Sequence, residues 1–177
     1  MVLLRSHEGP RVEGPANRRL NLMLSYGGWR EDSWADHLPR LLEPMGVRSL
    51  RVNSASEAAN LIRKEPVHIA VVDLCLPLEG RSSCDPDSSA SCSEFEEGGD
   101  RILQLLNRLE EPPPTLVVKR RKSRREGVRE TSSALRAGAF AVIERPVQLE
   151  LVLETMRRVL RRHYAGRWPE STCQTEQ

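Results

Sequence analysis

Short apolar runs alternate along the chain with stretches in which apolar residues recur at helical spacing. The runs predict five strands, at residues 20–24, 47–52, 68–72, 115–118 and 140–143. The helical spacing predicts five helices, at residues 34–45, 54–65, 102–109, 124–137 and 149–160. Gly46 and Gly138 follow two of these helices, as helix-ending glycines do. Ser54 and Glu57 have the spacing of a capping box, which predicts where the second helix begins.

The alternation of strand and helix predicts an α/β fold, with a parallel sheet and helices on both of its faces. The run at 68–72 has almost no polar break, which suits a central strand buried on both sides. In such sheets the functional crevice lies at the carboxyl ends of the strands. Asp73, Lys119 and Arg145 lie at or just after the ends of predicted strands, so we expect them at that edge.

The composition suits one domain with an aliphatic core, because the chain has 177 residues and only 4% aromatic residues. We expect a domain over residues 18–164 between flexible tails at 1–17 and 165–177. No run of 18 apolar residues occurs, and residues 1–17 lack the apolar stretch of a secretory signal. We therefore expect a cytoplasmic protein with no membrane partner.

The four cysteines match no zinc-binding signature, and no histidine lies near them in the sequence. Cys75 ends an apolar run and is expected to be a small core residue. Cys84 and Cys92 share a polar stretch, where free thiols are expected in a reducing cytosol; a redox pair is the alternative.

Three segments carry a resemblance to a known family. Residues 69–77 read Ile-Ala-Val-Val-Asp-Leu-Cys-Leu-Pro, residues 114–119 read Pro-Thr-Leu-Val-Val-Lys, and residues 138–146 read Gly-Ala-Phe-Ala-Val-Ile-Glu-Arg-Pro. They resemble the phosphoacceptor strand, the fourth strand and the Gly-Ala, strand, Lys-Pro segment of bacterial response-regulator receiver domains. The order and spacing of the elements match that family over roughly residues 18–163.

The resemblance implies a flavodoxin-like (βα)5 fold, a doubly wound five-stranded parallel sheet with strand order 2-1-3-4-5. It places Asp73 at the phosphoacceptor position, Lys119 where the family has Ser or Thr, and Arg145 where it has Lys. It implies a stand-alone receiver-like signalling protein of a two-component phosphorelay, not an enzyme. The implied partners are a histidine kinase or another signalling protein, and a second copy bound through the last two helices.

The departures from the family concern its metal site. The family has an acidic pair at the end of the first strand that holds Mg²⁺, whereas residues 24–27 read Leu-Ser-Tyr-Gly. Glu31 and Asp32 follow, where we expect them to start the next helix. Asp73 alone would be a weak metal ligand, so we expect no cofactor; a Mg²⁺ ion held by Asp73 is the alternative.

A receiver without that metal needs another source of positive charge beside Asp73. We expect Lys119 and Arg145 to replace the metal and to clamp Asp73, because a cation within about 4–6 Å holds an aspartate ionised. The protein would then keep the receiver fold and lose much of its phosphorylation chemistry. The isomer of the Arg145–Pro146 bond stays open, since X-Pro bonds adopt either form.

A net charge of +2 conceals two segments of opposite sign. Residues 78–100 hold seven acids and one base, and we expect an acidic insertion at about 78–99. Residues 119–136 hold eight bases and two acids, and we expect the acidic stretch to lie beside them and shield them.

The alternative function is binding of a polyanion or nucleic acid through phosphate contacts of the run 119–125. Besides Lys119, the candidate binding residues in that run are Arg120, Arg121, Lys122, Arg124 and Arg125. An enzyme or cofactor carrier is a third possibility, but no Gly-rich phosphate loop or recognisable catalytic set supports it.

Overall fold

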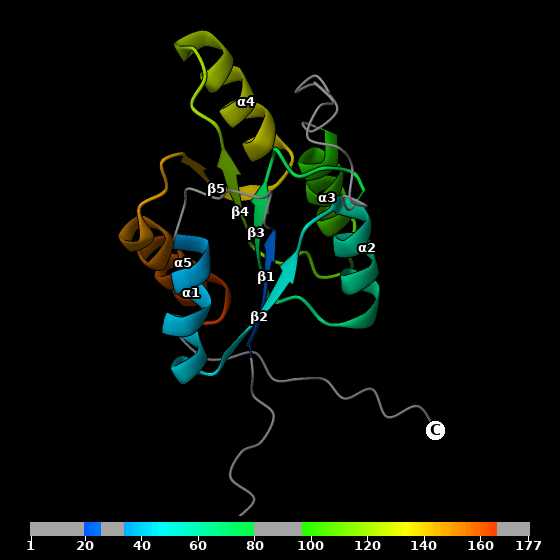
Figure 1. Cartoon of the computed structure of the whole chain (residues 1–177), viewed down its shortest axis with the longest axis vertical. Helices are drawn as coiled ribbons and strands as arrows, with labels where there is room; N and C mark the ends of the chain where they lie inside the picture. The colour runs from blue at the N-terminus through cyan, green and yellow to red at the C-terminus, as the bar shows by residue number, and fades with distance from the viewer. Residues whose placement is uncertain (1–19, 26–33, 80–96, 166–177) are drawn as a thin grey trace, which may run out of the picture.

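Five parallel strands form one sheet in the order β2-β1-β3-β4-β5, which confirms the predicted fold class and strand order (Figure 1). The computed structural model describes residues 20–25, 34–79 and 97–165. The strands are β1 (Leu20–Ser25), β2 (Val47–Val52), β3 (Ile69–Asp73), β4 (Thr115–Lys119) and β5 (Ala139–Glu144). The helices are α1 (Trp34–Leu42), α2 (Ala55–Lys64), α3 (Glu97–Asn107), α4 (Arg124–Arg136) and α5 (Leu149–His163), and a short 3-10 helix, η1 (Glu43–Met45), follows α1.

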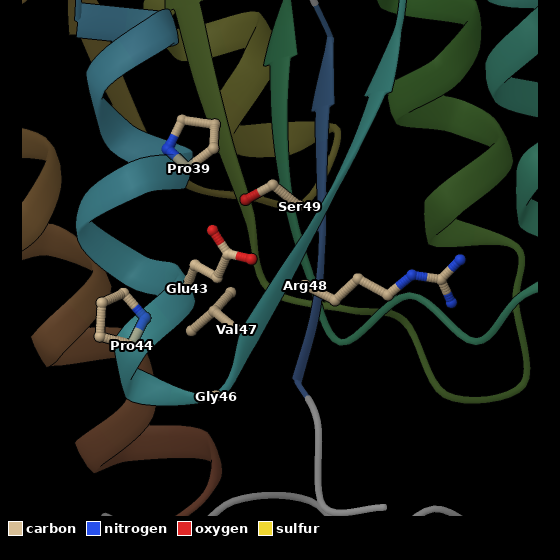
Figure 2. Close-up of a pocket in the computed structure, with 7 residues that line it drawn as sticks. All are labelled: Pro39, Glu43, Pro44, Gly46, Val47, Arg48 and Ser49. Carbon is tan, nitrogen blue, oxygen red and sulfur yellow. The ribbon is translucent and has the colours of Figure 1, made fainter.

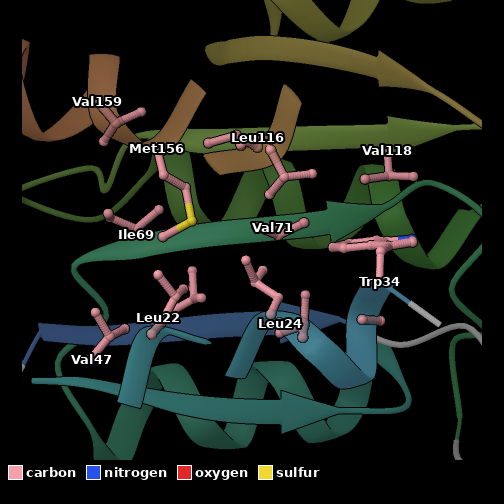
Figure 3. Close-up of a cluster of buried hydrophobic side chains, with 14 of the residues drawn as sticks. Leu22, Leu24, Trp34, Val47, Ile69, Val71, Leu116, Val118, Met156 and Val159 are labelled. Carbon is pink, nitrogen blue, oxygen red and sulfur yellow. The ribbon is translucent and has the colours of Figure 1, made fainter. Parts of the chain in front are cut away.

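Helices cover both faces of the sheet. α1 and α5 pack on one face, and α2, α3 and α4 pack on the other (Figure 1). On the first face Leu22, Val71 and Leu116 of the central strands meet Trp34 of α1 and Met156 of α5 (Figure 3). Because successive strand side chains point to opposite faces, the residues between them build the core under the other three helices.

The position of each strand follows from its sequence pattern. Every residue of β1, β3 and β4 is buried, as expected for aliphatic runs at the centre of a parallel sheet. β2 and β5 form the two edges, and each of them exposes part of its residues. Asp73 and Lys119 are the last residues of β3 and β4, which are neighbours in the sheet.

The predicted capping box starts α2. The Oγ of Ser54 accepts a hydrogen bond from the backbone N–H of Glu57 at 3.1 Å. The Glu57 carboxylate in turn accepts from the backbone N–H of Asn53 at 2.8 Å, one residue before the cap. The two bonds satisfy amides at the helix start that have no partner within the helix.

The first predicted helix, 34–45, is wrong at its end. α1 stops at Leu42, because Pro44 has no N–H to donate and disfavours helical backbone at the residue before it. The chain turns through η1 and ends it at Gly46, whose φ of 82° lies in the left-handed region. As a result Met45, which the prediction placed at the end of this helix, lies outside α1 and is 56% exposed.

Two further details differ from the pattern. α4 buries Gly127 and Ala134, whereas Val128 and Leu135 are 60% and 49% exposed, because one helical step turns a side chain by about 100°. α3 begins at Glu97, inside the stretch 78–99 predicted as an insertion. Residues 80–96 of that stretch, the predicted tail 1–17 and all but the first residue of the predicted tail 165–177 lie outside the described residues.

Candidate functional site

Asp73 lies at the carboxyl end of β3, where its side chain has no exposed surface. Its backbone N–H donates a hydrogen bond to the Oγ of Ser25, which ends β1, at 2.6 Å. Its Oδ1 accepts from the backbone N–H of Cys75 at 3.1 Å. One carboxylate oxygen is therefore held by the backbone that follows Asp73.

The other carboxylate oxygen forms an ion pair with Arg145. The Nη2 of Arg145 lies 2.6 Å from the Oδ2 of Asp73, the length of a short charge-assisted hydrogen bond. Arg145 follows β5, and its backbone N–H donates to the carbonyl oxygen of Lys119 at 3.0 Å. The peptide bond to Pro146, left open by the sequence, is cis. The side chain of Arg145 is 16% exposed, so the guanidinium covers a carboxylate that water does not reach.

The predicted clamp on Asp73 is wrong for Lys119. Its ammonium points to the opposite face of the sheet and contacts Glu144, at 2.8 Å, instead of Asp73. The reason is the two-residue period of strands: Asp73 shares a face with Val71, whereas Lys119 shares a face with Val117. By the same period Arg145 lies on the Asp73 face and Glu144 on the Lys119 face.

A second charge cluster, the Lys119 cluster, therefore lies under α4 on the other face of the sheet. Lys119 is fully buried, and its Nζ donates to the carbonyl oxygen of Gly127 at 3.1 Å. The carboxylates of Glu144 and Glu130 lie 2.8 and 3.8 Å from this nitrogen, and Lys122 reaches Glu130 at 3.3 Å. The hydrogen bond and charge of Lys119 lower the pKa of Glu144 below its ordinary value. Neither glutamate was predicted, although the alternation in β5 could have indicated Glu144.

The loop after Asp73, residues 74–79 (the Asp73 loop), is pressed between two helices. The backbone N–H groups of Ala55 and Ser56, at the start of α2, donate to the carbonyl oxygens of Pro77 and Leu78 at 2.9 and 3.0 Å. On the other side, a Cβ added to Gly99 of α3 would lie 2.4 Å from the carbonyl oxygen of Asp73. Only glycine permits this approach, so the Gly98-Gly99 pair is a structural requirement that the hydrophobic pattern does not predict.

The described residues around Asp73 do not fit a Mg²⁺ ion. Both carboxylate oxygens already have partners, and β1 ends in the hydroxyl of Ser25 rather than in a carboxylate. Mg²⁺ in proteins needs hard, charged oxygen ligands in an octahedral arrangement. Within the described parts of the chain no group of three His, Cys, Asp or Glu side chains could hold a metal. Glu31 and Asp32 lie outside those parts.

The basic run divides into a buried and an exposed part. Lys119 belongs to the Lys119 cluster, and Lys122 is half-buried against Glu130. The exposed members are Arg120, Arg121, Arg124 and Arg125. Cys75 is partly exposed rather than a core residue, whereas Cys84, Cys92 and most of the acidic insertion lie outside the described residues.

A hollow of about 380 Å³ lies between α1 and the edge strand β2 (Figure 2). Pro39 and Glu43 come from the helical side, and Val47 and Ser49 come from the strand (Figure 2). The hollow adjoins the amino end of β2, whereas Asp73 lies at the carboxyl end of β3. Because the strands are parallel, these two ends lie on opposite sides of the sheet along the strand direction. The hollow is therefore not part of the Asp73 site.

Similarity to known proteins lies in the structure alone, since no protein-family model and no curated protein matches the chain. The signal receiver domain of a Luxo repressor protein from Vibrio parahaemolyticus superposes with a TM-score of 0.61 at 16% identity, covering 84% of this chain and 95% of that one. A CheY-like response regulator receiver domain protein from Methanospirillum hungatei gives 0.59 at 20% identity, covering 84% and 99%. The non-phosphorylated HemR receiver domain from Leptospira biflexa gives 0.56 at 22% identity, covering 80% and 94%. This likeness shows that the chain has the receiver fold.

The helices give no sign of a membrane segment. None in the described ranges combines the length and the apolar character that a bilayer crossing needs.

Proposed function

We propose that this chain is a signalling protein of the response-regulator type that works without phosphorylation at Asp73. The observation that carries the proposal is the ion pair of Arg145 with a fully buried Asp73, at 2.6 Å. In this proposal the ion pair holds one fixed conformation, so the protein does not switch between phosphorylated and unphosphorylated states. It acts by contact with other proteins in that conformation.

The geometry opposes phosphoryl transfer for two reasons. The attacking carboxylate oxygen has to reach the phosphorus atom of a donor in line with the leaving group, but the side chain of Asp73 has no exposed surface. The transferred group also needs cations that neutralise its oxygens. Arg145 is committed to the carboxylate itself, and Lys119 is committed to Glu144 on the other face.

Intact-mass spectrometry tests the proposal directly. The full chain and its Asp73→Asn variant are incubated with Mg²⁺ and a small acyl phosphate, and a phosphorylatable receiver in the same tube serves as the positive control. We expect a phosphate-sized mass gain on the control receiver alone. A gain on the chain that Asp73→Asn abolishes would show a working acceptor and would refute the proposal.

The partners proposed are a histidine kinase or another signalling protein in the cytoplasm, with no catalytic activity in the chain itself. A second copy of the chain is a further partner, for which the exposed Val128 and Leu135 of α4 and Leu151 of α5 provide apolar contacts. Sedimentation of the chain and of a Val128→Ser, Leu135→Ser variant tests the second copy. A dimer that persists unchanged in the variant would place the contact elsewhere.

Polyanion binding is the alternative that the exposed Arg120, Arg121, Arg124 and Arg125 support. Against it, Lys119 is unavailable and the carboxylates of Glu126 and Glu130 lie among the bases. Binding of a labelled DNA duplex at rising salt separates the two functions. A steep fall of affinity with salt, removed by Arg-to-Ser changes in this run, would favour the alternative.

A further inference from the structure

A groove of about 580 Å³ runs between α2 and α3, which lie next to each other on one face of the sheet (Figure 1). Its apolar lining includes Ile62 of α2, Leu78 of the Asp73 loop, and Leu105 and Leu109 at α3. Each of these four side chains is half-buried, so part of its apolar surface faces the groove. Such side chains are the usual lining of a site that receives another apolar group.

The Asp73 loop forms one end of this groove and fixes its shape. The Oγ of Ser56 donates to the carbonyl oxygen of Leu78 at 3.0 Å, beside the bond from its backbone N–H. Ile62, Leu78 and Leu109 also pack on the buried core beneath. The groove is therefore preformed, so the protein loses little conformational entropy when a ligand binds in it.

The rim of the groove is basic on both helices. Arg63 of α2 and Arg101 of α3 line it, and both side chains are exposed. Arg63 is oriented by hydrogen bonds to Ala59 and Asn60 on its own helix. Glu79 is the one acid among the described residues that line the groove, so these residues carry more positive than negative charge.

We propose that this groove binds an amphipathic helix of a partner protein, with apolar side chains in the groove and carboxylates facing Arg63 and Arg101. The apolar floor between two helices matches the helix-in-groove mode of peptide recognition. The two arginines select an acidic over a basic helix and fix its position along the groove. The inference rests on the proposed function, in which a fixed receiver acts through a docking surface. The mass measurement above tests that function separately.

A designed peptide pair tests the groove. The probe is a fluorescent amphipathic peptide of Leu and Glu, about four helical turns or ~14 residues long, and its counterpart replaces every Glu by Lys. Anisotropy measures the affinity of each for the full chain, and ¹⁵N NMR shifts locate the binding. The groove variants are Leu105→Ser and Arg101→Glu. The matched controls are Leu41→Ser in α1 and Arg161→Glu in α5, which change exposed residues away from the groove.

We expect the acidic peptide to bind, with NMR shifts on α2 and α3, and each groove variant to weaken binding about tenfold, the loss of roughly one well-placed contact. The two control variants should bind as the unchanged chain does, and circular dichroism verifies that all four variants are folded. Equal affinity for the basic peptide, equal losses in the control variants, shifts centred on α4 and α5, or no binding at all would overturn the proposal.

Discussion

Replacing Arg145 by Met should destabilise the fold more than any other single change at the sheet edge. The substitution keeps an unbranched apolar stem and removes the guanidinium that faces Asp73. The carboxylate stays where it has no exposed surface, and its bond from Cys75 does not neutralise its charge. Breaking a buried pair by removing one partner typically costs about 3–5 kcal/mol. That is a large share of the ~5–15 kcal/mol that holds a typical domain together.

The reverse change, Asp73→Asn, should be milder. Arg145 is 16% exposed, so its guanidinium keeps part of its hydration when its partner loses its charge. The amide still accepts one hydrogen bond, and we expect a loss of about 1–2 kcal/mol. The double variant should lose less than the sum of the two single losses, with a coupling energy of about 2 kcal/mol.

Urea unfolding followed by circular dichroism measures all four proteins of this cycle. Arg158→Met, which removes an exposed ion pair with Glu154, is the matched control and should cost less than about 1 kcal/mol. If Arg145→Met unfolds at the same urea concentration as the control, or if the cycle is additive, the ion pair does not stabilise the fold. The proposal of a receiver locked by that pair would then lose its physical basis.

Three further outcomes follow from other sites. Gly99→Ala should lose about 2 kcal/mol or more in urea unfolding, because its Cβ would overlap the backbone of the Asp73 loop. Gly127→Ala should lose less, because its Cβ would meet only side-chain ends, Lys119 Nζ at 3.3 Å and Glu144 Oε1 at 3.7 Å. Burial lowers the pKa of His68, so as the pH falls the unfolded chain takes up a proton on this histidine before the folded chain does. The stability that the neutral His68 contributes is therefore complete above pH ~6.5 and is lost as the pH falls through the folded-state pKa. A His68→Gln variant should lack this part of the pH dependence of unfolding. Lys119→Met should raise the pKa of Glu144 toward its ordinary value, as followed by NMR titration, and an unchanged pKa would contradict the contact.

The arrangement of the fold could be predicted because its signals are local or periodic. The run before Asp73 has no polar break and became the central strand, and the Ser54 capping box starts α2 as expected. Errors came where one residue overrides a pattern. Pro44 ends α1 before the apolar spacing does, and the inward face of α4 is set by Gly127, not by its larger neighbour Val128.

The site was predicted only in part, because sequence places residues at an edge but does not by itself pair them across it. Arg145 and Asp73 are 72 positions apart and meet because both lie on the α1 and α5 face. Lys119 was assigned to the same pair because it ends the neighbouring strand. Side chains two positions apart in a strand point to the same face, so the position of Val117 places Lys119 on the face of the sheet that carries Glu144, opposite Asp73.

The Lys119 cluster also has an evolutionary consequence. Replacing Lys119 by the Thr that the receiver family has at this place would restore one residue of an acceptor site and damage the core. The smaller side chain would leave a void under α4, an unsatisfied carbonyl at Gly127, and two carboxylates, Glu130 and Glu144, without their shared cation. If the chain works without phosphorylation, as proposed above, a return to it requires several simultaneous changes, and each of the first ones lowers stability. Under the proposed function, the buried lysine would therefore preserve the loss of phosphorylation.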